Sequence, residues 1–565
     1  MSARISAGSM VPVRYVDRVR ERLGVDHAVL ALVVVLWAWL YLEGLGDYPL
    51  RVWDESRYAV PARHMVESGG WLDPRLRVNT HTGDLALTPR LVKPPLTYWL
   101  QGVAMLGFGV TTFAARLPTA LAVLGLAGFV YHVGRRTYDR RAGLAGAIVL
   151  LVFPGMLLGS HGGRAAVPDT LLALFGTGFV WFAWRGRERP RLLPVAGAFA
   201  GLAVMTKGFA AGVFVVVALP FLLRYLRAYL DRWRWTLAAV ATTVVVALPW
   251  HLYAWVAYGD EFVDQYLFRA VLSRMQGDLA QASGKTGIGF LNYPFIREGL
   301  QLLVPPYRYA VPVFLLGAIG AAIVVRRLVR RDGFAEHREK VLLGWWALAV
   351  PATFVLAGGN HPWYFLPMYV PGSVLVGYVP AALADGPLGT RVRSAVAGVR
   401  GRSTSPSDGR AGASTAGGSS AAFPSWAGFA AYAAVCVVVA LLLVATYAAP
   451  LGTPYDAEQR DVGRTIAGEV PEGESLYVWF GDDVERRALM SLDFYADRPF
   501  ERATPERLET DPAVRYAIVP IDRRDRIDRE HRVVATGSRN GVVVIEFVES
   551  PASTTDRTRW LLRPS

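Results

Sequence analysis

Residues 28–46 read AVLALVVVLWAWLYLEGLG, and residues 47–58 continue as DYPLRVWDESRY. The first stretch is almost wholly apolar and is close to the ~20 residues that a helix needs to cross the hydrocarbon core of a bilayer. The second stretch is polar and carries two adjacent carboxylates, Asp54 and Glu55. Together they predict a membrane-spanning helix that ends in a charged loop at the membrane surface.

Similar apolar runs recur as far as Ala449, and hydrophobic residues make up 53% of the 565-residue chain. This composition is too apolar for an ordinary soluble domain. The sequence therefore predicts a polytopic α-helical membrane protein with about eleven spans. We expect them near residues 27–45, 113–134, 142–161, 168–184, 192–206, 209–224, 235–257, 307–325, 341–357, 364–383 and 426–449.

The net charge of +14 belongs to the membrane half, because residues 451–565 hold 22 acidic and 17 basic residues. The arginines gather in short loops between apolar runs, as cytoplasmic loops do under the positive-inside rule, and do not form a nucleic-acid-binding patch. An odd number of spans then places the N-terminus in the cytoplasm and the C-terminal part outside the cell. The loops contain Arg135, Arg136, Arg140 and Arg141; Arg185, Arg187, Arg189 and Arg191; and Arg326, Arg327, Arg330 and Arg331.

Two units are expected, a transmembrane catalytic domain over residues 1–450 and a small extracytoplasmic α/β domain over residues 451–565, where strand-like and helix-like stretches alternate. The first outer loop, 46–112, holds two stretches typical of short interfacial helices. Residues 385–424 are rich in Gly, Ser, Ala and Arg and predict a disordered cytoplasmic linker. The single cysteine, Cys436, lies in an apolar run and gives no support to disulfides or a thiol nucleophile.

The outer loops carry the residues that predict chemistry. Asp54 and Glu55 precede Arg57 and Tyr58, and Lys93 follows later in the same loop. Only four of the 60 basic residues are lysines, so Lys93 and Lys207, both at predicted outer edges, are candidates for a compact ammonium group. A solvated pair of acids and ordinary surface lysines are the simpler interpretation of each residue alone.

Arg164 and Asp169 open the fourth predicted span at its outer edge, where charges are costly unless they are paired or line a polar cavity. They are site candidates, and an Arg164–Asp169 ion pair that fixes the turn is an equal alternative. Arg274, His361 and Tyr364 add further polar groups on the same predicted face. Taken singly, each of these three is also typical of an interfacial anchor.

These motifs together resemble the GT-C membrane glycosyltransferases of the protein O-mannosyltransferase and aminoarabinose-transferase superfamily. The resemblance covers most of residues 45–380. It rests on DESRY at 54–58, the A-R-x-M-x-x-x-G-x-W pattern ending at Trp71, KPPLTYWL at 93–100, ARLPTAL at 115–121, R-x-x-x-P-D at 164–169, AVMTKG at 203–208 and WYFLPMYVP at 363–371.

The resemblance implies transfer of a sugar from a polyprenyl or dolichyl phosphate on the outer membrane face. It implies Asp54 as catalytic base with Glu55 beside it, and Lys93 and Arg164 as phosphate contacts, with Arg57, Tyr58, Asp169, Lys207, Arg274, His361 and Tyr364 in the substrate site. Such a base would suit inverting displacement of a phosphate leaving group. The lipid-linked donor, membrane lipid and a glycoprotein or lipid acceptor are the expected partners.

Two observations bear on the branch of the superfamily. Val92 stands where the aminoarabinose branch usually has an acidic residue, which leaves a divalent metal and the acceptor open. The Arg-rich, Lys-poor composition favours an archaeal mannosyltransferase that uses dolichyl phosphate mannose, with an aminoarabinose-type transferase acting on a lipid as the alternative.

Two other classes of function remain open. A transporter or lipid flippase predicts repeats and ionisable groups near the bilayer centre, whereas the candidate residues here cluster at one predicted face. A scaffold for a cell-envelope complex would make the C-terminal domain its functional part.

Overall fold

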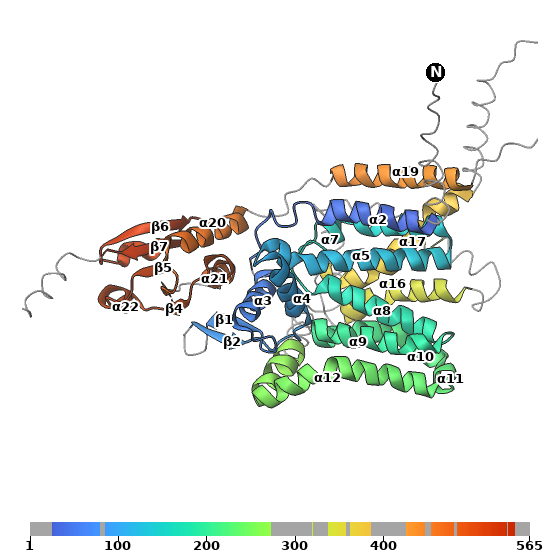
Figure 1. The fold of residues 1–565 in the computed structure, drawn as a ribbon, viewed down its shortest axis with the longest axis horizontal. Helices are drawn as coiled ribbons and strands as arrows, with labels where there is room; N and C mark the ends of the chain where they lie inside the picture. The colour runs from blue at the N-terminus through green and yellow to red at the C-terminus, as the bar shows by residue number, and fades with distance from the viewer. Residues whose placement is uncertain are drawn as a thin grey trace, which may run out of the picture.

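The computed structural model describes residues 25–52, 54–79, 85–272, 319, 322, 337–356, 362–385, 425–446, 454–479, 483–539 and 541–548. Most long helices lie side by side along the longest axis of the molecule (Figure 1). A group of short elements lies at one end of this bundle, and a β-sheet lies beyond that group. The bundle contains α2 (Val25–Tyr41), α5 (Thr112–Thr137), α6 (Arg140–Val152), α8 (Asp169–Gly186), α9 (Leu193–Lys207), α10 (Gly212–Arg224), α12 (Trp233–Val263), α16 (Arg338–Leu356), α17 (Tyr369–Asp385) and α19 (Ser425–Thr446).

Helices occur at ten of the eleven predicted spans, and the eleventh, 307–325, lies almost entirely outside the described residues. Within the described part, five segments are long and apolar enough to cross a membrane: Thr112–Thr137, Pro190–Arg224, Trp233–Arg269, Trp363–Ala382 and Gly428–Ala445. The chain is therefore a multi-pass membrane protein, and the count of eleven stays a prediction. The predicted disordered linker lies outside the described residues apart from Asp385.

The bundle packs closely where glycines let backbones approach each other, as small residues do in membrane helices. A Cβ on Gly143 of α6 would lie 2.6 Å from the carbonyl oxygen of Tyr131 in α5. α6 ends at Val152 because Pro154 cannot continue the hydrogen-bonded helix and Phe153 is extended. The prediction of one continuous span over 142–161 was wrong, since α7 (Pro154–Leu157) and an irregular loop follow.

α9 and α10 run in opposite directions along α8. Leu193 lies beside Gly186, where α8 ends, and Lys207 contacts Asp169, where α8 begins. Phe214 then lies against Gly176, and Phe221 packs on Trp184 near the far end of α8. The chain reverses in the 3₁₀ turn Gly208–Ala211, so the apolar run Pro190–Arg224 forms two helices, as the sequence predicted.

The first outer loop contains the two predicted short helices, α3 (Ser56–Ser68) and α4 (Leu96–Phe108). α3 ends where Gly69 adopts a φ of 73° and donates its N–H to the Met65 carbonyl. Between the helices lies an antiparallel pair that the sequence analysis missed, β1 (Arg75–Asn79) and β2 (Leu85–Pro89).

The C-terminal part forms a mixed five-stranded sheet in the order β4-β3-β5-β7-β6. The strand-like stretches that the sequence shows in this part are LYVWF, YAIVP and VVVIEF, and β3, β5 and β7 form within them. β4 and β6 were not expected. α21 packs against α3, so this unit contacts the first outer loop. Its elements are α20 (Pro454–Glu469), β3 (Leu476–Val478), α21 (Asp483–Ala496), β4 (Phe500–Arg502), α22 (Pro505–Thr510), β5 (Tyr516–Pro520), β6 (His531–Gly537) and β7 (Val542–Phe547).

Candidate functional site

Glu55 is fully buried and fully engaged. Its two carboxylate oxygens form a bidentate pair with Arg116, at 2.8 and 2.7 Å, and also accept the N–H groups of Ala166 and Arg51, both at 2.7 Å. Burial alone would raise the pKa of Glu55, but the charge of Arg116 and these hydrogen bonds lower it below its ordinary value. Glu55 is therefore an ionised carboxylate that ties the loop to α5 and to the loop before α8.

Asp54, one residue earlier, differs from Glu55 in both burial and hydrogen bonding. It is partly exposed, and its carboxylate makes no hydrogen bond or ion pair within the part of the chain that the structure describes. It lies within electrostatic range of His161, in the loop between α7 and α8. Of the two acids predicted together, Asp54 alone has a carboxylate available to a substrate.

Lys207 and Asp169 form an ion pair between the end of α9 and the start of α8. The Nζ of Lys207 lies 2.5 Å from Oδ1 of Asp169, and its ammonium group lies 5.8 Å from the centre of the Tyr364 ring. Lys93 is buried within electrostatic range of Asp169. The structure thus brings together Lys93, Asp169, Lys207 and Tyr364, which are far apart in the sequence.

His161 completes this group and was missed by the sequence analysis. Its ring stacks on Trp363 at a centroid distance of 3.9 Å, and the two rings line a pocket with Ser160 and Tyr369. Burial lowers the pKa of His161, although Asp169 and Asp54 oppose this effect. The imidazole is therefore neutral at pH 7 and does not neutralise Asp54. A lone His in a Gly-rich loop gave no signal in the sequence beyond its place three residues before the R-x-x-x-P-D motif begins at Arg164.

Arg164 does not pair with Asp169, so the ion pair considered as an alternative is wrong. Its guanidinium donates to the carbonyl of Leu40, at the end of α2, at 2.5 Å, and to the carbonyl of Glu43, just beyond α2, at 2.8 Å. These carbonyls lack intrahelical partners, and a cation is favourable there. Asp169 instead faces Lys207.

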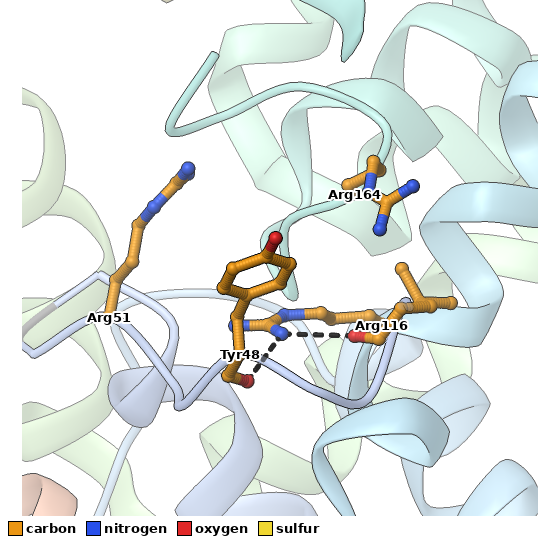
Figure 2. Close-up of a pocket in the computed structure, with 5 residues that line it drawn as sticks. Tyr48, Arg51, Arg116 and Arg164 are labelled. Carbon is orange, nitrogen blue, oxygen red and sulfur yellow. Dashed lines mark hydrogen bonds between the residues drawn. The ribbon is translucent and has the colours of Figure 1, made fainter. Parts of the chain in front are cut away.

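Arg164 lines a hollow with Tyr48, Arg51 and Arg116, as Figure 2 shows. The space is about 220 Å³ with its open mouth included. Arg116 donates to the carbonyls of Leu45 and Tyr48 at 3.0 and 2.8 Å and so holds the loop that leads to Asp54 (Figure 2). Arg116 stands in the ARLPTAL motif, but its distant partners were not evident from the sequence.

Tyr58 lies on α3 with its ring stacked on Tyr98 of α4, at a centroid distance of 5.8 Å. Burial raises the pKa of Tyr58, so its phenol stays protonated and can donate a hydrogen bond. Arg57 lies within electrostatic range of that phenol. Arg274 and His361, the other two predicted site residues, lie outside the described residues.

No group of three or more His, Cys, Asp or Glu side chains that could hold a metal occurs among the described residues. The arrangement instead combines Asp54, Asp169 and Lys207, all within electrostatic range of His161, with Lys93, which is within range of Asp169. It can accept a proton from a hydroxyl and stabilise an anionic leaving group.

The fold has a close counterpart among solved structures. The crystal structure of ArnT from Cupriavidus metallidurans bound to undecaprenyl phosphate superposes with a TM-score of 0.63 at 20% identity, over 94% of this chain and 99% of that one. The chain therefore has a GT-C fold, as the motifs predicted.

Sequence comparisons agree with this GT-C assignment. Residues 92–253 match the family model for dolichyl-phosphate-mannose-protein mannosyltransferases. An undecaprenyl phosphate-α-4-amino-4-deoxy-L-arabinose arabinosyl transferase of Proteus mirabilis is 28% identical over 62% of this chain, and one of Shewanella sediminis is 28% identical over 61%. The matches span 58% and 59% of the length of these relatives. They favour the aminoarabinose alternative over mannose from dolichyl phosphate.

Proposed function

We propose that this GT-C protein transfers a sugar from a polyprenyl phosphate, with undecaprenyl phosphate as the carrier, to an acceptor hydroxyl. The observation that carries the proposal is the contrast between two neighbouring acids. Glu55 is saturated with partners, whereas the Asp54 carboxylate has no hydrogen bond or ion pair within the described part of the chain and lies, like Lys207, within electrostatic range of His161. The carrier is supported by the ArnT structure and by the names of the curated relatives.

In the proposed reaction, Asp54 takes the proton of the acceptor hydroxyl, and the oxygen attacks the anomeric carbon. The bond from that carbon to the phosphate oxygen breaks, so the sugar inverts and the polyprenyl phosphate departs as an anion. Lys207 pairs with Asp169, and Lys93 lies buried within electrostatic range of the same carboxylate. Lys93 is proposed to stabilise the negative charge of the leaving phosphate. Glu55 acts as a positioning residue rather than as a second catalytic acid.

The site is proposed to face outward. The Arg-rich turns at 135–141 and 185–191 meet at the opposite end of the bundle, where Arg135 pairs with Asp26 at 2.8 Å and Arg136 pairs with Glu339 at 3.0 Å. Under the positive-inside rule that end is cytoplasmic. The arrangement also disfavours a transporter, because the ionisable groups of the site gather at one end of the bundle.

The sugar is proposed to be a 4-amino-4-deoxy-L-arabinose-like pentose, because the two curated relatives are named as transferases of that sugar. Mannose is the second candidate, favoured by the family model over residues 92–253. The two donors are distinguished by supplying each on undecaprenyl phosphate to the protein in nanodiscs, with lipid and glycoprotein fractions as acceptors.

The test of the catalytic assignment is Asp54→Asn. Asn keeps the size of the side chain but cannot accept the proton, so transfer is expected to fall about 10²- to 10⁴-fold. Binding of undecaprenyl phosphate is expected to stay within a factor of two of the wild type. Asp47→Asn is the matched control, because Asp47 is an exposed carboxylate in the same loop. Wild-type turnover by Asp54→Asn would refute the base assignment, and failure of the wild type with both donors would refute the proposed function.

A further inference from the structure

Arg90 is a buried arginine next to the candidate site. It follows β2, three residues before Lys93, and its own N–H donates to the Pro74 carbonyl at 2.6 Å. Only 9% of the residue is exposed. The short connection to Lys93 places two buried cations on one segment of the first outer loop.

Every other buried arginine among the described residues has a partner for its guanidinium. Arg116 binds Glu55, Arg63 binds Glu67, Arg185 and Arg187 bind Glu188, and Arg498 donates to three carbonyls. The side chain of Arg90 makes no hydrogen bond or ion pair within the described part of the chain, and its Nε is a buried donor without an acceptor. Burying an uncompensated charge is costly, so such a group is expected to have an anionic ligand.

The phenols of Tyr58 and Tyr98 belong to the surroundings of Arg90. Tyr58 is within electrostatic range of Arg90 and stacks on Tyr98. The hydroxyl of Tyr98, a fully buried residue, has no hydrogen-bond partner among the described residues. A guanidinium within electrostatic range of one phenol, which stacks on a second, offers donors for an oxyanion, which accepts several charge-assisted hydrogen bonds at once.

We propose that Arg90, with Tyr58 and Tyr98, forms an oxyanion-binding subsite for the glycosyl donor. This inference rests on the proposed function and adds a substrate property to it. The oxyanion is either the phosphate of the polyprenyl carrier or an acid group on the transferred sugar, in which case the donor carries a sugar acid in place of aminoarabinose or mannose. Both present the same chemistry to Arg90, and the experiment separates them.

The experiment uses the full-length protein in nanodiscs as wild type, Arg90→Gln and Arg90→Lys. The matched control is Arg75→Gln, because Arg75 belongs to the same hairpin, is partly exposed and already pairs with Asp73. Binding is titrated with undecaprenyl phosphate and with undecaprenol. Transfer is measured with the donor that the wild type uses among undecaprenyl phosphate-linked aminoarabinose, mannose and a sugar acid. The melting temperature of each ligand-free protein is recorded.

Arg90→Gln is expected to weaken the anion contact at least about 10-fold, since a hydrogen bond between charged groups is lost. Weaker binding of undecaprenyl phosphate, but not of undecaprenol, would identify the carrier phosphate as the oxyanion. A raised KM for transfer with unchanged carrier binding would identify an acid group on the sugar. Arg90→Lys is expected to lie between wild type and Arg90→Gln, and Arg75→Gln to equal the wild type.

The ligand-free melting temperature provides the decisive readout. Removal of an uncompensated buried charge is expected to leave it unchanged or raise it, whereas removal of a structural arginine lowers it. Wild-type behaviour of Arg90→Gln in every assay, or weak binding accompanied by a lower melting temperature, would overturn the subsite while leaving the proposed function intact. A wild type that neither binds undecaprenyl phosphate nor transfers sugar would overturn the proposed function itself.

Discussion

The neighbouring carboxylates Asp54 and Glu55 have different surroundings in this protein. Asp54 and Glu55 differ by one methylene and one position. Glu55 nevertheless points inward to Arg116, whereas Asp54 has no side-chain partner among the described residues. The sequence located the pair but treated both acids as members of the site. Their difference depends on Arg116 and Ala166, which lie on other elements and follow no local spacing rule.

The Glu55–Arg116 pair is expected to be a main stabilising contact of the loop. Glu55→Gln leaves Arg116 buried with an uncompensated charge, so the free energy of unfolding should fall by about 3–5 kcal/mol. The double variant Glu55→Gln, Arg116→Met should recover part of that loss. Thermal unfolding in detergent measures both. Equal melting temperatures for the wild type and Glu55→Gln would show that the pair is not stabilising.

The same carboxylate predicts a dependence of stability on pH. The pKa of Glu55 in the folded protein is below its ordinary value of 4.5, so the unfolded chain binds the proton more readily. The stabilisation is therefore complete above about pH 4.5 and is lost as the pH falls through the lower pKa of the folded state. Melting temperatures recorded from pH 7 to pH 3 should decline less steeply for Glu55→Gln than for the wild type.

At the scale of elements, the turn between α9 and α10 positions Lys207. Gly208 has a φ of 60°, which favours glycine, and a Cβ there would lie 2.7 Å from the Tyr266 hydroxyl. Because Lys207 is the preceding residue, strain in the turn is transmitted to the Lys207–Asp169 ion pair.

Gly208→Ala should therefore destabilise the protein by about 1–3 kcal/mol and reduce sugar transfer. Gly212→Ala is the control, because Gly212 has a helical φ of −57° and no atom within 4 Å of an added Cβ. That variant should be as stable as the wild type or slightly more stable. Melting temperature and transfer rate measured on both variants test this assignment, which fails if they behave alike.

The helices were predicted better than the short strands and the contacts between elements. Long apolar runs and Arg-rich turns located the bundle helices because burial in lipid demands a fixed length of apolar residues. The hairpin of β1 and β2 was missed because its strands, RLRVN and LALTP, are short and lie in a loop without a strong turn signal. Arg90 and His161 were missed for a related reason, since their significance depends on residues that approach from other elements.

The whole molecule is polarised along its long axis. Among the described residues, the Arg-rich turns at 135–141 and 185–191 lie at one end of the bundle, and the site, α3, α4 and the C-terminal sheet lie at the other (Figure 1). This separation links the topology to the function, because a reaction at the outer surface requires both the site and the sheet to be outside.

Cysteine labelling tests that orientation, since Cys436 is the only cysteine in the chain. In a Cys436→Ala background, Glu472→Cys adds a thiol to an exposed turn beside the C-terminal sheet, and Arg189→Cys adds one to an Arg-rich turn. A membrane-impermeant maleimide added to intact cells should label position 472 only. Permeabilised cells should be labelled at both positions, and the reverse pattern in intact cells would place the site in the cytoplasm.

The contacts between the C-terminal unit and the loop before Asp54 also set the order of assembly. The N–H of Leu50 donates to the Tyr495 hydroxyl at 2.6 Å, across 445 residues, and the N–H of Val52 donates to Asp456 at 2.9 Å. A ribosome that adds about 5–20 residues per second needs roughly 20–90 s to reach Tyr495 after Leu50. Throughout that interval the nascent chain lacks these two acceptors. The loop that carries Asp54 therefore reaches its final form only after Tyr495 has been made, which delays maturation of the site until the C-terminal sheet unit has been synthesised.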